Sequence, residues 1–590
     1  MTIQQDIASS PALRHPFSEG QWQQLQQLLR TFNEQQAFWL SGYLAAGKQP
    51  TFTTASPSSG VKILIAYGTE TGNSKGLAEQ LEAQLSKQKI STRVTSLADL
   101  KPRALAKVDY LLVICSTHGD GDPPEPAVPF FEALQSEQAP RLEQLNYAVL
   151  ALGDSSYEHF CTAGIVLDDR LAQLGGQRLL PRKDCDVDYQ QPASNWLNEV
   201  AAKLPRADSP SAQVAVASPL IDEALAADTY SKQQPLAVEV LENIRLSHSQ
   251  RRLPIHHLEL LLPVDNFHLA PGDAVGIMPH NPPALVAAVL DACALSGDEA
   301  VILNERAMPL VQALREQLDL TIPSQSFLDY WAATSANEML KQEAAADAKQ
   351  RRAFLKQQQL LDLLQTYPAT ADAQHLVDSL RPLQPRLYDV ANLVNEGTDE
   401  IHLLVQAYEY VMNNKSVRGI ASDYLLHIQP GENIFIYPHH NKRFHLPEQT
   451  DMPIILIGWG TGIAPFRAFA QQIITGERSH PCWLVFGEQS FEDDFLYQLE
   501  WQQASAKGRL QRLDTVFIDE QPDQCLSAPL IAHLSELAEW IARGAHIYLC
   551  GDKGRLTQCE THLQPLYDQL QTTMSWKQLD QAKRIHRNLY

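Results

Sequence analysis

Small and hydroxyl side chains follow a short apolar run near residue 65, in an order that suits phosphate binding. The apolar run covers residues 63–67, and a helical pattern begins near Lys75. The loop between them consists of Gly68, Thr69, Glu70, Thr71, Gly72, Asn73 and Ser74. At a helix N-terminus, backbone N–H groups and hydroxyls can surround a phosphate. The loop lacks the Gly-Lys-Ser/Thr ending of nucleotide-hydrolysing loops, so we expect it to hold a phosphate monoester without transferring it.

Two further polar loops follow the apolar runs 110–115 and 147–152. The first begins with Ser116, Thr117, His118 and Gly119. The second consists of Leu152, Gly153, Asp154, Ser155, Ser156, Tyr157, Glu158, His159, Phe160 and Cys161. Ligands of doubly wound sheets bind beyond the carboxyl ends of the strands. We therefore expect the three loops to meet around an isoalloxazine ring that stacks on Tyr157, with surface packing as the alternative for that side chain.

The elements that must position these loops divide the chain into several domains. Residues 61–204 alternate strands with helical patterns, which predicts a parallel α/β domain, and residues 448–590 return to this alternation. The strand-rich segments 236–280 and 384–447 predict one β-barrel, interrupted by a helical insertion over 281–383 that includes the helix-favouring residues 343–364. Residues 205–235 predict a flexible linker; about 30 residues span roughly 30 Å, enough for the first domain to move between two partners.

The first 60 residues contain a Gln-rich helical pattern at 19–45, which predicts either a small docking helix pair or an oligomerisation segment. No basic region followed by an apolar core begins the chain, so we expect no signal peptide. No apolar run approaches the length of about 20 residues that spans a membrane. With eight cysteines and no Cys-x-x-Cys pair, we expect neither a zinc site nor a disulfide framework, but reduced thiols in the cytoplasm.

The composition excludes some classes of partner. The 590 residues carry a net charge of −22, which argues against nucleic acid and against an anionic membrane surface. A basic protein partner is compatible with this charge, although most acidic surfaces only maintain solubility.

The three loops together resemble flavodoxin-type FMN domains. The segment 152–161 and the segment Asp-Val-Asp-Tyr-Gln-Gln at 186–191 resemble the sulfite reductase flavoprotein (alpha) subunit, a member of the diflavin reductase family. This resemblance implies FMN, FAD and NADPH as cofactors. His118 stands where the family usually has Gln or Tyr, so it either contacts the flavin and makes its potential pH-sensitive or is a solvated loop residue.

The resemblance also assigns residues to the FAD barrel. Arg386, Leu387 and Tyr388 match the family's Arg-x-Tyr-Ser signature, in which Arg clamps the pyrophosphate and Tyr reaches the flavin–ribityl region. By resemblance, further FAD contacts are Gly419, Ile420, Ala421 and Ser422, then Thr321, Val405 and Tyr410, and the terminal Tyr590, which would cover the flavin.

The last segment resembles the family's nicotinamide domain, but it departs from the family where the coenzyme is selected. Gly460, Thr461 and Gly462 match the pyrophosphate loop, and Cys550 would lie near the nicotinamide, with a buried core thiol as its alternative. The family's Ser-Arg pair, Lys and Tyr, which grip the 2′-phosphate, are Ile518, Asp519, Gln524 and Leu526 here. Asp519, Glu520 and Asp523 would repel that phosphate, so we expect its recognition to be lost and NADH to be an alternative coenzyme.

Two departures lie beside the flavin. The family's Ser next to flavin N5 is Asp389 here, and the family's acidic residue two positions before the terminal aromatic is Asn588. A carboxylate near the nicotinamide stabilises the cation left after hydride departure. We therefore expect Asp389 to replace the lost acid, with decay of the reductase half as the alternative.

These patterns predict a multidomain α/β protein with a flavodoxin-like FMN domain, an antiparallel β-barrel FAD domain with a helical insertion, and a Rossmann-like nicotinamide domain. The resemblance implies electron flow from NADPH through FAD and FMN to a sulfite reductase beta (haemoprotein) subunit, with homo-oligomerisation through the N-terminal segment. Two alternatives remain. One is a diflavin reductase that uses NADH or serves another acceptor. The other is a flavin electron-transfer module that no longer oxidises NADPH.

Overall fold

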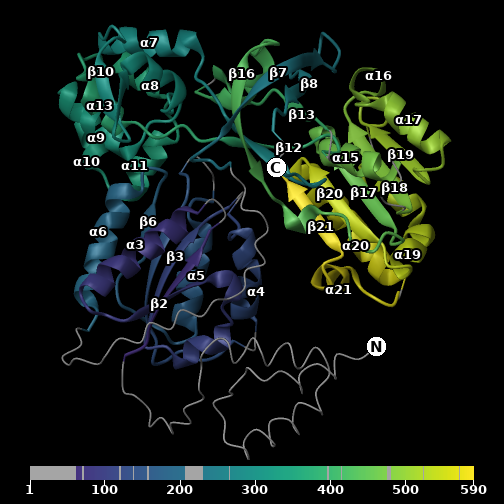
Figure 1. The fold of residues 1–590 in the computed structure, drawn as a ribbon, viewed down its shortest axis with the longest axis horizontal. Coiled ribbons are helices and arrows are strands. Elements are labelled where there is room, and N and C mark those ends of the chain that lie inside the picture. The colour runs from purple at the N-terminus through teal and green to yellow at the C-terminus, as the bar shows by residue number, and fades with distance from the viewer. Residues whose placement is uncertain are drawn as a thin grey trace, which may run out of the picture. The chain divides into compact units, whose positions relative to one another are not determined.

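The structure is a computed structural model that describes residues 61–69, 72–118, 121–136, 139–155, 159–205, 230–264, 266–394, 398–413, 415–474, 480–522, 524–570 and 572–590 (Figure 1). The predicted N-terminal segment 1–60 and most of the predicted linker lie outside these residues. The described residues form three larger sheets, each with its own topology. Their topologies confirm the predicted fold class.

The first sheet has six parallel strands in the order β2-β1-β3-β4-β5, with β6 beside β4. Its strands are β1 (Ile63–Gly68), β2 (Thr92–Ser96), β3 (Tyr110–Ser116), β4 (Asn146–Leu152), β5 (Gln177–Arg178) and β6 (Lys183–Cys185). Its helices are α3 (Asn73–Lys87), α4 (Val128–Gln135), α5 (Thr162–Gln173) and α6 (Gln190–Lys203), with short 3-10 turns η1 (Leu97–Asp99), η2 (Pro102–Lys107) and η3 (Glu125–Ala127).

Alternate side chains of these strands enter two separate cores. Ile63 and Ile65 pack with Leu81 of α3 and Trp196 of α6, whereas Leu64 and its alternates pack with α4 and α5. Strands that are apolar on both faces are typical of a parallel sheet covered by helices on both sides. The sheet is therefore doubly wound, and its loops at the carboxyl ends of the strands form one edge.

The second sheet is antiparallel, with six strands in the order β12-β9-β16-β7-β8-β13. The strands are β7 (Leu236–Arg245), β8 (Ile255–Leu261), β9 (Ala274–Met278), β12 (Arg386–Asp389), β13 (Glu400–Gln406) and β16 (Asn433–His439). An antiparallel bridge between Val390 and Leu403 joins the segment after β12 to β13 and closes the sheet into a barrel. The accessory elements are the hairpin β14 (Glu409–Met412) and β15 (Lys415–Arg418), and α14 (Ile420–His427).

The insertion between β9 and β12 has its own core around Phe327 and Trp331. Its helices are α7 (Pro283–Cys293), α8 (Leu310–Glu316), α9 (Gln325–Thr334), α10 (Glu338–Ala345), α11 (Ala348–Leu355), α12 (Leu360–Thr366) and α13 (Ala373–Ser379), with the hairpin β10 (Ala300–Leu303) and β11 (Arg306–Pro309). The helix-favouring stretch 343–364 is divided among three helices. Extended backbone at Ala346 and Gln359 interrupts it, which lets Leu340, Leu355 and Leu364 all reach the same core.

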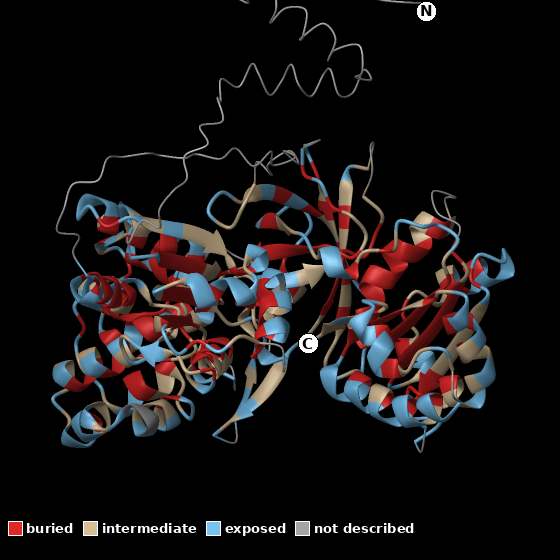
Figure 2. Cartoon of the chain, turned by 90° about the horizontal axis from the view of Figure 1, so that it is seen from below, coloured by how far each residue is buried: buried red, intermediate tan, exposed pale blue. Residues whose placement is uncertain are grey.

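The third sheet has five parallel strands in the order β19-β18-β17-β20-β21. The strands are β17 (Ile454–Trp459), β18 (Cys482–Glu488), β19 (Arg512–Phe517), β20 (His546–Gly551) and β21 (Ile585–Leu589). The helical elements are η4 (Lys442–Phe444), η5 (Gly460–Gly462), α15 (Ile463–Ile474), α16 (Phe491–Asp494), α17 (Gln498–Ala506), α18 (Ala528–Ala532), α19 (Leu534–Ala542), α20 (Lys553–Gln569) and α21 (Trp576–Gln581). Figure 2 shows the central strands buried and the outer faces of the helices exposed.

Candidate functional site

The three polar loops of the first domain are joined by hydrogen bonds along the carboxyl edge of its sheet. The Ser116 hydroxyl donates to the Gly68 carbonyl (3.4 Å). The Thr117 N–H donates to the Leu152 carbonyl (2.8 Å), and the Gly153 N–H donates to that of Cys185 (3.0 Å). The loops therefore meet at one edge, as the motif order predicts.

Helix α3 begins at this edge with free hydrogen-bonding capacity. Gly72 is its N-cap at φ 87°, and among the described residues this N-cap position makes no side-chain cap hydrogen bond. The Ser74 side chain is fully buried, and its hydroxyl has no hydrogen-bond partner among the described residues. An uncapped helix N-terminus with a buried unpaired hydroxyl fits a phosphate, which would accept from both. The fit supports Thr69, Gly72, Asn73 and Ser74 as the phosphate-binding set of a bound FMN.

Replacing Ser74 tests this fit. We expect Ser74→Ala to raise the Kd for FMN about tenfold, because a hydrogen bond to a charged group contributes roughly 1.5–3 kcal/mol. The same change removes an unpaired buried hydroxyl, so the melting temperature of the FMN-free protein should rise. Fluorescence titration and thermal unfolding measure the two effects, with Ser86→Ala on the exposed face of α3 as the control. Unchanged FMN affinity would contradict the assignment.

The other predicted residues of these loops have mixed surroundings. His118 is exposed and pairs with Asp122 through the backbone, and His159 is exposed as well. Asp154 pairs with Arg381, and Ser155 donates to Asp186. Glu70, Thr71, Gly119, Ser156, Tyr157 and Glu158 lie outside the described residues, so the stacking of Tyr157 stays a prediction.

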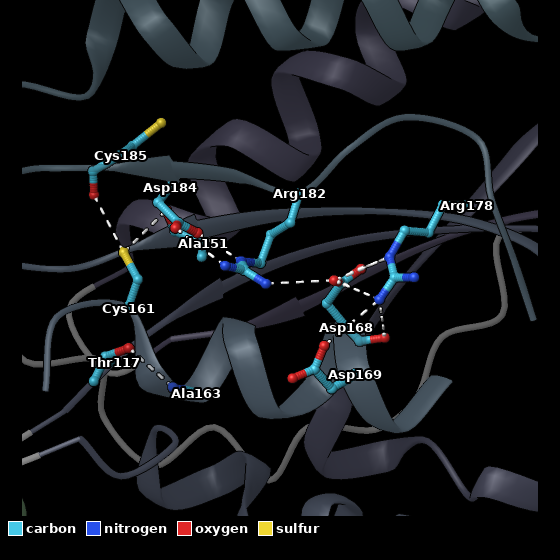
Figure 3. A network of polar contacts seen from close by, with 10 residues as sticks. All are labelled: Thr117, Ala151, Cys161, Ala163, Asp168, Asp169, Arg178, Arg182, Asp184 and Cys185. Atoms are coloured by element: carbon cyan, nitrogen blue, oxygen red, sulfur yellow. Dashed lines mark hydrogen bonds and ion pairs between the residues drawn. The ribbon is translucent and has the colours of Figure 1, made fainter. Parts of the chain in front are cut away.

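Cys161 and Leu152 are buried in this domain, and Phe160 lies below the Arg352 guanidinium. The Cys161 thiol is directed at the carbonyls of Ala151 and Cys185, at 3.6 and 3.7 Å (Figure 3). In the same view the Thr117 hydroxyl accepts from the Ala163 N–H at the start of α5 (3.3 Å). These backbone contacts hold the loop 152–161 in place. Cys161 and Thr117 therefore position the predicted flavin-binding loops from their buried side.

The barrel presents the predicted FAD residues from two elements. Arg386 and Leu387 are exposed on β12, and the adjacent Tyr388 is half-buried. Gly419 precedes α14 and supplies no side-chain cap, so the backbone at Ile420, Ala421 and Ser422 can approach a pyrophosphate. The exposed guanidinium of Arg386 fits the same anion.

The remaining residues predicted to contact FAD form hydrogen bonds or core contacts within the protein. The Thr321 hydroxyl donates to Asp319 (2.6 Å), and the Tyr410 hydroxyl accepts from Gln359 (3.1 Å). The Val405 side chain is buried in the barrel core. Contact of these three residues with FAD stays a prediction.

Asp389, at the end of β12, lies against two strands of the third sheet. The Asn588 side-chain amide donates to both carboxylate oxygens of Asp389, at 2.9 and 3.0 Å. The Cys550 thiol donates to Asp389 Oδ2 at 3.7 Å. Cys550 and Asn588 are paired neighbours on β20 and β21. The structure thus brings together the three residues that the sequence nominates for catalysis.

Burial governs the ionisation of this group. Burial raises the pKa of Asp389 to about 6, against hydrogen bonds from Asn588 and Cys550 that lower it. Burial and then the neighbouring Asp389 raise the pKa of the Cys550 thiol well above its usual value. Near neutral pH the thiol is therefore protonated, and the carboxyl is mostly ionised.

The glycine-rich loop lies directly beside Cys550. Gly460 has φ 58°, and a Cβ on Gly462 would lie 2.0 Å from the Cys550 carbonyl oxygen. The Thr461 and Tyr590 hydroxyls are hydrogen-bonded at 3.1 Å. Tyr590 is 58% exposed, so its ring is available to a ligand. The missing Cβ of Gly462 therefore lets the start of α15 pack directly against β20, which is the role that the last glycine has in a dinucleotide-binding loop.

The predicted coenzyme-selecting loop follows β19. Asp519 and Glu520 are exposed; Asp519 accepts from the Gln489 side chain, and Glu520 accepts from the Phe491 N–H (3.0 Å). Asp523 lies outside the described residues. Leu526, in the position of the family's Tyr, is buried in the domain core beside Gly487.

The sequence motifs do not single out Arg467 or Tyr497. Arg467 follows the glycine-rich loop on α15, and Tyr497 precedes α17. A basic residue inside an otherwise apolar helix start has to be paired when buried, so this signal could have found Arg467; no comparable signal marks Tyr497.

Comparisons with known proteins cover nearly the whole chain. Residues 65–196 match a flavodoxin family model, 228–424 an FAD binding domain, and 456–560 an oxidoreductase NAD-binding domain. A sulfite reductase [NADPH] flavoprotein alpha-component of Bacillus subtilis is 37% identical over 92% of each chain. The proteins of the same name from Aliivibrio fischeri and Yersinia enterocolitica are 34% and 37% identical, over 98% and 93% of this chain and 99% and 92% of their own. FMN, FAD and a nicotinamide coenzyme are thereby supported as cofactors, and the two alternative functions are not favoured.

Proposed function

Because the chain belongs to the family of sulfite reductase flavoprotein alpha-components, we propose that it carries electrons from NADPH through FAD and FMN to a haemoprotein beta subunit that reduces sulfite to sulfide. The observation that carries the proposal is the meeting of Asp389 from the barrel with Cys550 and Asn588 from the nicotinamide domain. This contact joins the two modules between which a hydride has to pass.

The bound flavins supply the redox chemistry of hydride acceptance and one-electron release. The protein's own residues bind and orient the reactants. Asn588 fixes the orientation of the Asp389 carboxylate through both oxygens, and with a nicotinamide bound beside Cys550 the ionised carboxylate would stabilise the positive charge left by hydride departure. The neutral Cys550 thiol adds a weak hydrogen bond without adding charge.

The coenzyme site carries a further prediction. Asp519 is an exposed carboxylate in the loop assigned to the 2′-phosphate, so it should weaken NADPH binding. We expect Asp519→Ser to lower the KM for NADPH roughly three- to tenfold at low ionic strength and less at high salt, because exposed charges are screened. Steady-state kinetics across a salt series measures this. Glu132→Ser, an exposed change in the first domain, should leave the KM unchanged. An equal KM in both variants would place the 2′-phosphate elsewhere.

The assembly around this chain is also a proposal. The names of the relatives imply a partner haemoprotein subunit, and we assign homo-oligomerisation to the N-terminal segment 1–60. All eight cysteines are free thiols, which supports a reducing, cytoplasmic location. Among the described helices, none combines the length and apolar character needed to cross a bilayer.

A direct experiment tests the function. The purified protein, reconstituted with FMN and FAD, is mixed rapidly with NADPH while flavin absorbance is followed, and the beta subunit and sulfite are then added. We expect rapid flavin bleaching, followed by sulfide formation that requires both subunits. Bleaching without sulfide would assign another acceptor, and no bleaching with NADPH would overturn the proposal.

A further inference from the structure

Arg467 is a buried cation at the boundary between the barrel and the nicotinamide domain. Its Nε and one terminal nitrogen donate to the Glu500 carboxylate, at 2.8 to 3.1 Å. Its other terminal nitrogen donates to the Ala391 carbonyl (2.9 Å) and to His402 Nδ1 (3.2 Å). A single guanidinium therefore binds α17 of one domain and two segments of the other.

The two segments that Arg467 joins carry the reacting groups. Ala391 lies two residues after Asp389, and Arg467 lies five residues after Gly462 on the helix that the glycine-rich loop begins. A second bond repeats the connection, because the Leu393 N–H donates to the Gln471 side chain of the same helix (2.8 Å). The guanidinium thus links the segment that follows Asp389 to the helix that follows the glycine-rich loop.

Tyr497 and two histidines enclose the guanidinium. The Arg467 carbon Cζ lies 4.7 Å from the centre of the Tyr497 ring, within the range of a cation–π contact. The Tyr497 hydroxyl is 2.9 Å from His257 Nδ1, and the His257 and His402 rings are 4.9 Å apart. Tyr497 has φ 55°, a left-handed conformation that an aromatic residue adopts only when its surroundings hold it there.

The hydrogen bonds assign the tautomer of each histidine. Arg467 can only donate, so His402 Nδ1 accepts and the proton lies on Nε2, which faces Glu400 (3.1 Å). His257 Nε2 faces Glu259 (3.2 Å), so it too carries the proton, and Nδ1 accepts from Tyr497. Burial is the main cause that lowers the pKa of His257 to about 3, which keeps the ring neutral.

These tautomers decide whether the group formed by His257, Glu259 and His402 is suited to bind a metal ion. His257, Glu259 and His402 have ligand atoms within 4.8 Å of one another, a spacing that could hold a metal ion. A metal would need an Nε2 without its proton, and it would lie beside the Arg467 cation. The cluster is therefore better suited to hold Arg467 than to bind an ion.

We propose that Arg467 is a positioning residue, which sets the distance between the Asp389 strand end and the dinucleotide loop through its bonds to Ala391, His402 and Glu500. The inference rests on the proposed function, because it concerns the hydride transfer between these two elements. Lysine keeps the charge at this position but cannot bridge three acceptors with a planar fork.

The test compares Arg467→Lys with Arg512→Lys. Arg512 is a matched control, since it lies over Trp483 (4.8 Å) and pairs with Asp514 and Glu536 entirely within the nicotinamide domain. Stopped-flow reduction of the reconstituted protein by NADPH, and by NADPH deuterated at the transferred position, gives the limiting rate, the half-saturation concentration and the isotope effect. Hydrogen exchange of the peptides around residues 388–394 and 463–470, in the flavin-free protein, is the second readout.

We expect Arg467→Lys to lower the limiting rate by about tenfold or more, because small misplacements of reacting groups have large effects on rate. The isotope effect and the exchange of both peptides should rise, while the half-saturation concentration changes less than about twofold. Arg512→Lys should alter none of these. Tyr497→Phe, which removes only the hydroxyl, should act in the same direction more weakly and serves if Arg467→Lys does not fold.

Three outcomes would overturn the inference: equal rates in Arg467→Lys and Arg512→Lys, an effect on half-saturation alone, or activity lost to a chelator and restored by zinc. The last would make the His257 cluster a metal site. Failure of the wild-type protein to bleach with NADPH would instead overturn the proposed function, so the two failures are distinguishable.

Discussion

Asp389→Asn is expected to lower the limiting rate of flavin reduction by NADPH about 10²-fold, with little change in half-saturation. The substitution keeps the shape of the side chain and a partner for Asn588, but it removes the charge that would stabilise the nicotinamide cation. Loss of one preorganised electrostatic contact at a reacting centre has effects of this size. Stopped-flow reduction measures the rate. Asp399→Asn, an exposed change ten residues along the chain, should be silent.

The pH dependence of the flavin reduction rate should also differ between wild type and Asp389→Asn. With the pKa of Asp389 raised to about 6, the wild-type rate should fall about tenfold per pH unit below pH 6 and be level above pH 7. The rate of Asp389→Asn should not fall in this way below pH 6, because the variant has no carboxyl to protonate. A raised carboxyl pKa means that the folded state binds the proton more tightly than the unfolded state, so stability is lost as pH rises through 6. Asp389→Asn should therefore melt higher than wild type at pH 8, although it reacts more slowly.

A double variant tests whether Asp389 has taken over the role of the acidic residue that the family has at position 588. Asp389→Ser should be as slow as Asp389→Asn. The double variant Asp389→Ser/Asn588→Asp returns the carboxylate to β21, where it faces the same space, and it should recover most of the rate. If the double variant stays as slow as the single variant while retaining FAD and its melting temperature, the charge at this position is not the group that acts.

Gly462→Ala is expected to abolish reduction by NADPH while leaving both flavins bound. A Cβ at this position would lie 2.0 Å from the Cys550 carbonyl oxygen and 2.3 Å from its carbon. These are backbone atoms of a central strand that cannot yield, so η5 must move away from β20 by more than 1 Å, on the order of the displacement that costs 10²-fold in rate. Stopped-flow reduction measures the loss, and flavin absorbance after gel filtration measures retention.

Gly508→Ala is the matched control for this change. Gly508 has φ 66° and no atom near its missing Cβ, so the variant tests backbone strain in the same domain without a clash. It should reduce stability slightly and leave the rate unchanged. If Gly462→Ala is reduced by NADPH at the wild-type rate, the contact between η5 and Cys550 does not position the dinucleotide.

Much of the first domain could be predicted from residue order. An apolar run followed by Thr, Ser, Asn or Gly indicates where a buried strand ends and a polar loop begins. On this basis β1, β3 and β4 end within two residues of the expected positions. The helix-favouring stretch 343–364 is helical over most of its length, but the sequence does not show where it is interrupted. Packing of Leu340, Leu355 and Leu364 against a common core accompanies these interruptions, and no local pattern in the sequence encodes that packing.

The sequence by itself determined the fold class, the order of the cofactor modules and the identity of the two exchanged residues, Asp389 and Asn588. These features depend on local patterns and on position along the chain. Only the tertiary structure decided that Asn588 holds Asp389 through both oxygens, that the Ser74 hydroxyl is buried without a partner among the described residues, and that Arg467 joins the barrel to α15. Such contacts join residues tens to hundreds of positions apart, and their geometry arises from the packing of whole domains, which no local pattern encodes.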